Sequence, residues 1–287
     1  METISPGTRI GAVTLRVAEL SQSLEFYRHV VGLELLAKAD GQGRLGAGER
    51  ELLILQGAPG ARSAPGTTGL YHLALLLPSR RDLAAAVHRI LRSGYSLEGA
   101  ADHIVSEAVY LRDPEGNGIE IYSDRPRAEW LDGRGKIRMG TLPFDLPGLL
   151  REFPPSADGV GELPQGTGVG HIHLHVSSLE EAESFYCGVL GFGHVMRYGT
   201  SAGFVSAGGY HHHIGLNTWA GEGAPPPPTD ARGLVRFQIV VPDRSALDPL
   251  LERLEKSATF FEETADGVML RDPSQNGIAL TVGSAPA

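Results

Sequence analysis

The chain repeats itself, and this duplication constrains its fold more than any other feature. The segment GAVTLRVAELSQSLEFYRHVVGLEL, which begins at Gly11, reappears with many of the same residues as GHIHLHVSSLEEAESFYCGVLGFGH from Gly170. In the same way LRDPEGNGIEI from Leu111 reappears as LRDPSQNGIAL from Leu270. Self-similarity over such lengths marks a supersecondary unit that has been copied. The two halves of the chain are therefore two copies of one domain.

Each half divides again into two similar units. A strand-like run at Val13–Val17 leads into a helical pattern at about 21–31, for which Ser21 fits an N-cap and Gly32 fits the end, and further strand-like runs follow. The same order recurs in the next segment, with a helix at about 80–93. The pattern predicts an α+β fold with four βαβββ units, which we call repeats 1 to 4, at roughly 9–56, 68–123, 168–219 and 231–282.

The joints between the repeats agree with this division. Pro/Gly-rich loops occupy 57–68 and 220–230, between repeats 1 and 2 and between repeats 3 and 4. We therefore predict a first domain at 1–124, a connecting segment at 125–167 and a second domain at 168–287. The connecting segment holds apolar residues that predict packing against some other surface, and these are Leu142, Phe144, Leu146, Leu149 and Leu150.

The composition excludes several classes of protein. A net charge of -9, with scattered arginines and only three lysines, argues against a nucleic-acid partner. The N-terminal residues lack the pattern of a secretory signal, and no apolar stretch approaches the ~20 residues that cross a bilayer. The one cysteine, Cys187, excludes an internal disulfide and is interpreted as a packed residue. We expect a cytoplasmic protein without membrane contact, and a homo-oligomer is possible.

Two histidine-rich segments are candidates for chemistry. In GHIHLHV, the two-residue period of a strand puts His171, His173 and His175 on one face. Such a face is either a metal site or a polar surface in contact with water. In GGYHHHIGLN, three histidines occupy 211–213, but a triplet alone is weak evidence because surface runs of histidine bind metals adventitiously.

Comparison of the copies isolates a polar set in repeat 2. The set consists of His72, His103, Tyr110 and Glu120, whereas the matching positions of repeat 4 hold Arg236, Glu262, Met269 and Ala279. Unrelated structural residues have no reason to be present or absent together, so we interpret the set as one functional constellation. His171 of repeat 3 likewise corresponds to Ala12 of repeat 1. Repeats 2 and 3 must therefore pair if one site is to contain all of these residues.

The repeated units, the FY…LG helix and the DP-x-G-N-x-I-E strand resemble the vicinal oxygen chelate superfamily. This superfamily includes extradiol dioxygenases, glyoxalase I, and the fosfomycin- and bleomycin-resistance proteins. The resemblance covers nearly the whole chain, and GHIHLHV, SAGGYHHHIGLNTWAG and LYLRDPEGNGIEIY most resemble the two-domain bacterial catechol 2,3-dioxygenases. It implies two half-barrel domains, with repeats 2 and 3 paired around the metal.

The resemblance also implies an activity and its residues. The expected reaction is extradiol cleavage of catechol or a substituted catechol by O2 at one Fe(II) ion, with Mn(II) as the alternative metal. Carried over onto this sequence, the metal ligands are His72, His171 and Glu120. The expected catalytic residues are His212, Tyr110 and His103, with His211 and His213 as alternatives to His212, and the expected substrate-binding residues are His173 and His213.

Two other functions remain open at this point. A glyoxalase-type isomerase needs a fourth protein ligand, commonly an acid, where this sequence has Gly215. A metal-free binding protein of the bleomycin-resistance type would lack the ligands altogether. The DP-x-x-N-G segments at 113–118 and 272–277 occur in both copies, so we interpret them as hairpin turns in which Asn-Gly supplies the positive φ angles.

Overall fold

Two eight-stranded sheets form the framework of the computed structural model, which describes residues 3–153 and 161–283. One sheet has the strand order β14-β15-β16-β13-β1-β4-β3-β2 and the other has the order β10-β11-β12-β9-β5-β8-β7-β6. The first sheet is built from β1 (Arg9–Val17), β2 (Glu34–Ala39), β3 (Gln42–Ala47), β4 (Arg50–Gly57), β13 (Gly233–Val241), β14 (Phe261–Thr264), β15 (Gly267–Arg271) and β16 (Gly277–Val282). The second is built from β5 (Gly69–Leu77), β6 (Gly99–Asp102), β7 (Ser106–Arg112), β8 (Gly118–Asp124), β9 (Gly168–His175), β10 (Gly193–Tyr198), β11 (Ala202–Ser206) and β12 (Ile214–Asn217).

This strand order confirms the predicted pairing of the repeats. Strands of repeats 2 and 3 share one curled sheet, with β5 and β9 as neighbours, and strands of repeats 1 and 4 share the other. The mixed α/β architecture of duplicated half-barrels is the predicted one. By its contacts the chain forms two compact units, one of Met1–Arg16, Ala61–Tyr71 and Gly170–Ala287 and the other of Val17–Gly60 and His72–Val169.

The helices that follow the first strand of each repeat cover the sheets. They are α1 (Leu20–Phe26) with the π-helix η1 (Tyr27–Val31), α2 (Arg80–Arg92), α4 (Leu179–Glu183) with the π-helix η3 (Ser184–Val189), and α5 (Arg244–Lys256). Two further helices, the 3-10 helix η2 (Arg127–Glu129) and α3 (Leu146–Arg151), lie in the connecting segment. Among the described residues, none of the helices is long and apolar enough to cross a membrane.

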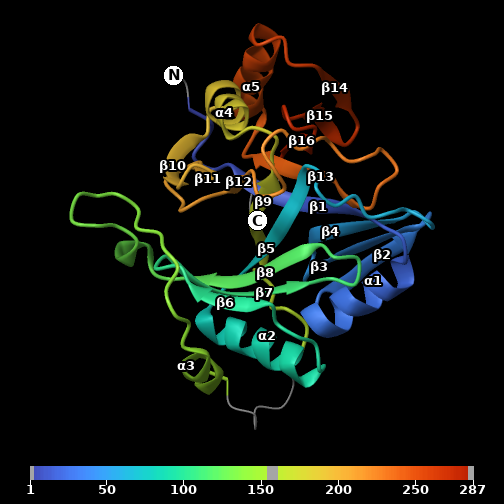
Figure 1. Ribbon diagram of the computed structural model, residues 1–287, viewed down its shortest axis with the longest axis vertical. Helices are drawn as coiled ribbons and strands as arrows, with labels where there is room; N and C mark the ends of the chain where they lie inside the picture. Colours follow the sequence, from blue (N-terminus) through green and yellow to red (C-terminus); the bar gives the residue numbers. More distant parts are fainter. Residues whose placement is uncertain (1–2, 154–160, 284–287) are drawn as a thin grey trace. The chain divides into compact units, whose positions relative to one another are not determined.

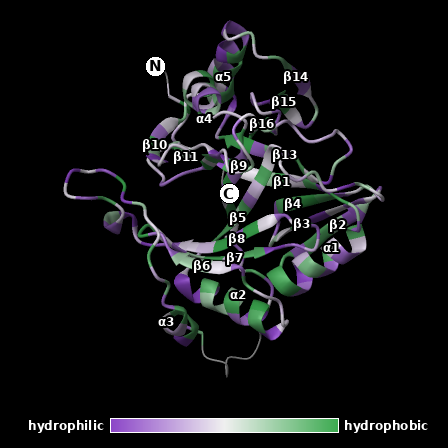
Figure 2. Ribbon diagram, viewed as in Figure 1, coloured by the Kyte–Doolittle hydropathy of each residue, from purple (hydrophilic) through white to green (hydrophobic). Residues whose placement is uncertain are grey.

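Helix α2 shows why these segments fold as they do. The Ser79 side chain caps its first turn by accepting the Asp82 N–H at 3.2 Å. Its apolar face buries Leu83, Val87 and Ile90 completely against β8, and Figures 1 and 2 show this helix beside the β6–β8 strands with alternating hydrophobic and hydrophilic residues. Each such burial stabilises the fold by about 1.5–3 kcal/mol.

The first helix differs from its prediction in two respects. The N-cap position is Glu19 rather than Ser21, and no side chain caps this end. The Glu19 N–H donates to Glu115 Oε1 at 2.8 Å, so a carboxylate from another loop satisfies one of the free N–H groups at this helix end. The second half of the predicted helix is π-helical, and it ends as expected at Gly32, whose φ is 95°.

The DP-x-x-N-G turns also differ in detail. The positive φ lies one residue before the asparagine, at Gly116 (92°) in repeat 2 and at Gln275 (67°) in repeat 4, rather than on Asn-Gly. Asp113 explains this because its Oδ1 accepts the N–H groups of Glu115 and Asn117 at 2.9 and 2.8 Å. The carboxylate closes the loop, and the residue between these two N–H groups must take the left-handed conformation.

A buried tyrosine locks each turn to a helix. The Tyr27 hydroxyl donates to Asp113 Oδ2 at 2.9 Å, and the Tyr186 hydroxyl donates to Asp272 Oδ2 at 3.0 Å. Burial raises the pKa of both carboxyl groups, although the hydrogen bonds that they accept oppose this shift. Burial also raises the pKa of both tyrosines well above the ordinary value, so each stays a donor at neutral pH.

The connecting segment packs in part as predicted. Leu149 of α3 is fully buried, and α3 lies against α2, where the Leu150 carbonyl contacts His88 Nε2 at 3.2 Å. Leu142, in contrast, is 49% exposed. Its backbone nevertheless forms a bridge with Asp102, at the end of β6.

Candidate metal centre

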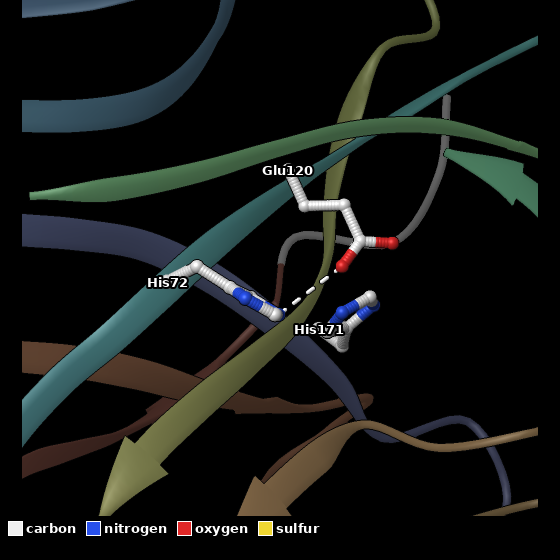
Figure 3. Close-up of side chains that lie close together, drawn as sticks. All are labelled: His72, Glu120 and His171. Atoms are coloured by element: carbon white, nitrogen blue, oxygen red, sulfur yellow. Dashed lines mark ion pairs between the residues drawn. The ribbon is translucent and has the colours of Figure 1, made fainter. Parts of the chain in front are cut away.

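The pairing of β5 with β8 brings an imidazole and a carboxylate together. These strands run parallel, with His72 opposite Gly118 and Ala74 opposite Glu120, so the two polar side chains leave the same face of the sheet. His72 Nε2 lies 3.1 Å from Glu120 Oε2, and the residues are only 6% and 3% exposed (Figure 3). A buried carboxylate needs a charged or hydrogen-bonding partner, so this pair is a polar centre in an apolar sheet.

Tyr110 and His103 lie next to this pair. In the antiparallel pairing of β7 with β8, Tyr110 stands opposite Glu120, and its ring centroid is 5.8 Å from that of His72. The Tyr110 hydroxyl lies 2.6 Å from His103 Nε2, which is a short hydrogen bond. The polar set that distinguishes repeat 2 from repeat 4 is therefore contiguous in space.

The second nitrogen of His103 contacts the connecting segment. His103 Nδ1 lies 2.8 Å from the carbonyl oxygen of Gly140. The sequence held no signal for this contact, because any residue type can supply a backbone carbonyl and only the folded chain decides which one is near.

The histidines of β9 lie in aromatic surroundings. His171 and His173 are 1% and 4% exposed. The His173 ring packs against Tyr71 and Trp219, with centroids 5.0 and 5.4 Å away. Gly215, its partner on β12, leaves room for this ring, since a Cβ there would lie 2.8 Å from His173 Cγ. Tyr71 and Trp219 were not singled out from the sequence, although Tyr71 directly precedes His72.

The three consecutive histidines occupy different surroundings. The His212 ring lies beside the His171 ring, tilted by 48° with centroids 4.1 Å apart, and His212 Nδ1 lies 2.9 Å from His211 Nδ1. His213 Nδ1 accepts the Ala207 N–H at 3.1 Å. His213 is thus engaged with the backbone of its own loop, whereas His212 lies beside the β9 histidine.

His72, Glu120 and His171 have the composition of a metal-binding group. Their ligand atoms all lie within 4.8 Å of one another, and all three residues are buried (Figure 3). Two imidazoles and one carboxylate are the ligands that non-haem Fe(II) sites use, and they leave coordination positions open. A closed structural zinc site would need a fourth ligand, usually cysteine. The part-buried Cys187 is ill suited to this, because burial raises the pKa of its thiol to about 11.

Comparisons with known proteins agree with this geometry. The family described as Glyoxalase/Bleomycin resistance protein/Dioxygenase superfamily matches residues 9–121 and 168–280, so the chain belongs to this superfamily. The catechol-2,3-dioxygenase of Bacillus subtilis (strain 168) is 48% identical over 278 residues, which are 95% of this chain and 96% of that relative.

Solved structures share the fold at much lower identity. Glyoxalase I from Zea mays has a TM-score of 0.58 at 14% identity and covers 95% of this chain and 92% of its own. The CppA protein from Streptococcus pneumoniae TIGR4 has a TM-score of 0.58 at 15% identity and covers 98% of this chain and 99% of its own. At identities this low, the structural likeness establishes the fold alone, and the function must be inferred from the residues of the site.

Proposed function

We propose that this chain is an extradiol dioxygenase that opens the ring of catechol or a substituted catechol with O2 at a single Fe(II) ion. The observation that carries the proposal is the arrangement within repeat 2. A buried imidazole and carboxylate lie 3.1 Å apart, beside a tyrosine that is hydrogen-bonded to a histidine. A relative that is 48% identical and is named catechol-2,3-dioxygenase supports it.

His72, Glu120 and His171 are the proposed ligands. One carboxylate and two neutral imidazoles leave a divalent ion with part of its charge uncompensated and with positions open for substrate oxygens. When bound, Fe(II) would supply these positions and pass charge between the aromatic ring and O2. Mn(II) prefers similar ligands and remains the alternative metal.

The remaining polar residues are proposed to transfer protons and to orient the substrate. His212, beside His171, is the proposed acid/base, because an imidazole can hold or release a proton near neutral pH. Tyr110 is proposed to orient the substrate oxygens by hydrogen bonding, and His103, which is hydrogen-bonded to the Tyr110 hydroxyl, supports it. His173, flanked by Tyr71 and Trp219, is proposed to contact the substrate from an aromatic wall. His213 is a weaker candidate because its Nδ1 already accepts a backbone N–H.

An anaerobic reconstitution tests the proposal. Protein loaded with Fe(II) is mixed with a small panel of catechols, and O2 is then admitted while oxygen uptake and the yellow ring-opened product are followed. We expect one O2 consumed for each ring opened. Protein that binds stoichiometric Fe(II) and consumes no O2 with any catechol would contradict the proposed activity.

A variant separates the acid/base from the ligands. His212→Ala should slow turnover by about 10²-fold or more while iron stays bound, since general acid–base catalysis contributes factors of this size. His29→Ala, on an exposed helix face, is the control and should leave both quantities unchanged. Loss of iron from His212→Ala would move His212 from the acid/base to the ligand set.

The glyoxalase-type alternative is disfavoured by Gly215. An acidic ligand there would occupy the space of the His173 ring. Lactoyl-thioester formation by the Fe(II)- or Zn(II)-loaded protein would support this alternative, and a protein that binds no metal under anaerobic conditions would support a metal-free binding protein. The domain limits at 124 and 168, a cytoplasmic location and a possible homo-oligomer remain predictions.

A further inference from the structure

The segment that connects the two halves of the chain contacts His103. The His103 Nδ1–Gly140 O distance of 2.8 Å is one contact, and the Gly140 N–H approaches the His103 carbonyl at 3.4 Å. One step further along, the N–H and carbonyl groups of Asp102 and Leu142 exchange hydrogen bonds of 3.2 and 2.8 Å. Residues 140–142 thus run as a short extra strand along the loop that carries His103.

Other contacts hold this short strand in place. Trp130, which is 3% exposed, donates its indole N–H to the Arg125 carbonyl at 2.8 Å and accepts the Arg138 N–H on its own carbonyl at 2.7 Å. Arg125 Nη2 lies 2.8 Å from Asp102 Oδ2. The segment is therefore tied to the β6–β7 loop at several points on both sides of Gly140.

The loop itself is in an unfavourable conformation. Ile104, which follows His103, has a φ of 73°, a region that β-branched residues rarely adopt. Such a conformation is unfavourable and persists only where the surroundings enforce it. Two sets of contacts hold Ile104 in this conformation. The loop is hydrogen-bonded to residues 140–142, and the Ile104 N–H donates to Asp102 Oδ1 at 2.8 Å.

The Gly140 contact also decides the direction of the next hydrogen bond. A carbonyl oxygen can only accept, so His103 Nδ1 must carry the proton. In the neutral ring Nε2 is then an acceptor, and the Tyr110 hydroxyl donates to it. The tyrosine consequently presents an oxygen lone pair, rather than its proton, to a neighbouring substrate hydroxyl.

We propose that residues 140–142 of the connecting segment are a positioning element, which fixes the tautomer and orientation of His103 through the Gly140 carbonyl and so makes Tyr110 a hydrogen-bond acceptor toward the substrate. The consequence for the reaction rests on the proposed dioxygenase function, whereas the tautomer does not. The role resembles that of the carboxylate that orients the histidine of a hydrolytic triad.

Substitutions at Gly140 displace this carbonyl without straining the backbone, because its φ is not positive. A Cβ there would lie 3.2 Å from Ile104 Cδ1, so Gly140→Ala is a mild and Gly140→Val a stronger perturbation. Ile104→Gly in the Gly140→Val background makes room again and tests rescue. Gly133→Val is the matched control, since it lies in the same segment with nothing within 4 Å of its Cβ and no positive φ.

The first readout is ¹⁵N NMR of the imidazoles at pH 8 in metal-free protein, with the His103 signals assigned by comparison with His103→Gln. We expect Nδ1 to be protonated and Nε2 to be unprotonated in the wild type. Gly140→Val should lose this single-tautomer signature, Gly140→Ala should weaken it, and the Ile104→Gly rescue should restore it.

The second readout is steady-state kinetics of the Fe(II)-loaded protein. Gly140→Val should lower kcat about tenfold, with iron content unchanged and KM for catechol within about twofold, since positioning supplies part of an acid–base contribution. An Nε2–H tautomer in the wild type, or wild-type signals and kcat in Gly140→Val, would overturn the inference. Absence of ring opening in the wild type would refute the proposed function instead, and the NMR result would still decide the positioning role.

Discussion

Repeats 2 and 4 are built with the same contacts. Their helices α2 and α5 begin with equivalent caps, Ser79 and Asp243, and each sends an arginine to a carbonyl at the end of a π-helix. Each repeat also has a turn aspartate that accepts a buried tyrosine hydroxyl and an asparagine amide. These groups satisfy backbone or buried polar atoms, so any copy of the fold must retain them or replace them.

The two repeats differ at one set of matching positions. Repeat 2 places His72, His103, Tyr110 and Glu120 there, and their counterparts in repeat 4 are Arg236, Glu262, Met269 and Ala279. The first three counterparts line a cavity of about 580 Å³. The part-buried Arg236 lies 3.5 Å from the exposed Asp266, and an ion pair of this kind contributes little to stability.

The difference separates the requirements of the scaffold from those of the chemistry. The turn, the helix cap and the tyrosine–aspartate hydrogen bond each satisfy polar groups within one copy of the fold, so every copy needs its own. A metal site needs only one complete set of ligands, so the second copy can lose its set without losing its fold. The predictions below therefore concern positions that correspond between repeats.

The largest expected difference concerns the proposed metal ligand His72. His72→Ala should lose stoichiometric iron and lower activity about a thousandfold or more, because the ion supplies several kcal/mol of transition-state stabilisation. Arg236→Ala at the matching position should leave iron content and activity unchanged. Iron determination after anaerobic reconstitution and oxygen uptake check both variants. Stoichiometric iron in His72→Ala would contradict the proposed ligand set.

Removing either tyrosine hydroxyl should lower the stability of the protein equally, but only one of the two changes should lower its activity. Tyr27→Phe and Tyr186→Phe each remove a buried hydrogen bond and should lower the free energy of unfolding by about 1–3 kcal/mol. Urea unfolding measures this loss. Only Tyr27→Phe should also reduce turnover, since its turn leads from the strand of Tyr110 to that of Glu120. Equal turnover in the two variants would show that the turn does not control the site.

The two turn aspartates that these tyrosines contact predict a pH dependence of the free energy of unfolding. Burial raises the folded-state pKa of Asp113 and Asp272 above the ordinary value of 3.8, so the folded chain binds these protons more tightly than the unfolded chain does. The stability from these groups is present below pH 3.8 and is lost as the pH rises through the folded pKa.

Removal of a tyrosine hydroxyl should raise that folded-state pKa further, because a hydrogen bond to the carboxylate lowers it. The loss of unfolding free energy in Tyr186→Phe should therefore be larger at pH 7 than at pH 4. Urea unfolding at both pH values, with Tyr27→Phe as the paired variant, measures this trend. A loss that does not change with pH would mean that Asp272 does not change its ionisation between pH 4 and pH 7 in the folded protein.

The smallest effect concerns repeats 1 and 3. Cys187 of repeat 3 corresponds to Arg28 of repeat 1, and burial together with nearby Glu183 raises the pKa of the thiol to about 11. Alkylation by iodoacetamide should therefore be slow at pH 8 and should accelerate up to pH 11, because the thiolate is the reactive form. Cys187→Ser should abolish labelling and leave turnover unchanged. Rapid alkylation at pH 8 would contradict the packed state of this thiol.

Much of this could be read from the sequence. The repeats, their pairing in shared sheets and the polar set of repeat 2 followed from comparing the copies, because duplication lets one part of a chain serve as a reference for another. The N-cap of the first helix was wrong, because the Glu115 carboxylate binds the Glu19 N–H from a distant loop. The turns were misassigned by one residue because a side chain, rather than Asn-Gly, closes them.

The sequence by itself determined which residue types are present, in which repeat, and on which face of a strand, since these follow from composition and the two-residue period. Only the tertiary structure decided that Gly140 directs its carbonyl at His103, that His213 serves its own loop, and that Gly215 accommodates the His173 ring. These relations depend on backbone atoms and on packing between segments distant in the chain. Neither leaves a periodic or compositional trace, and so both appear only when the chain is folded.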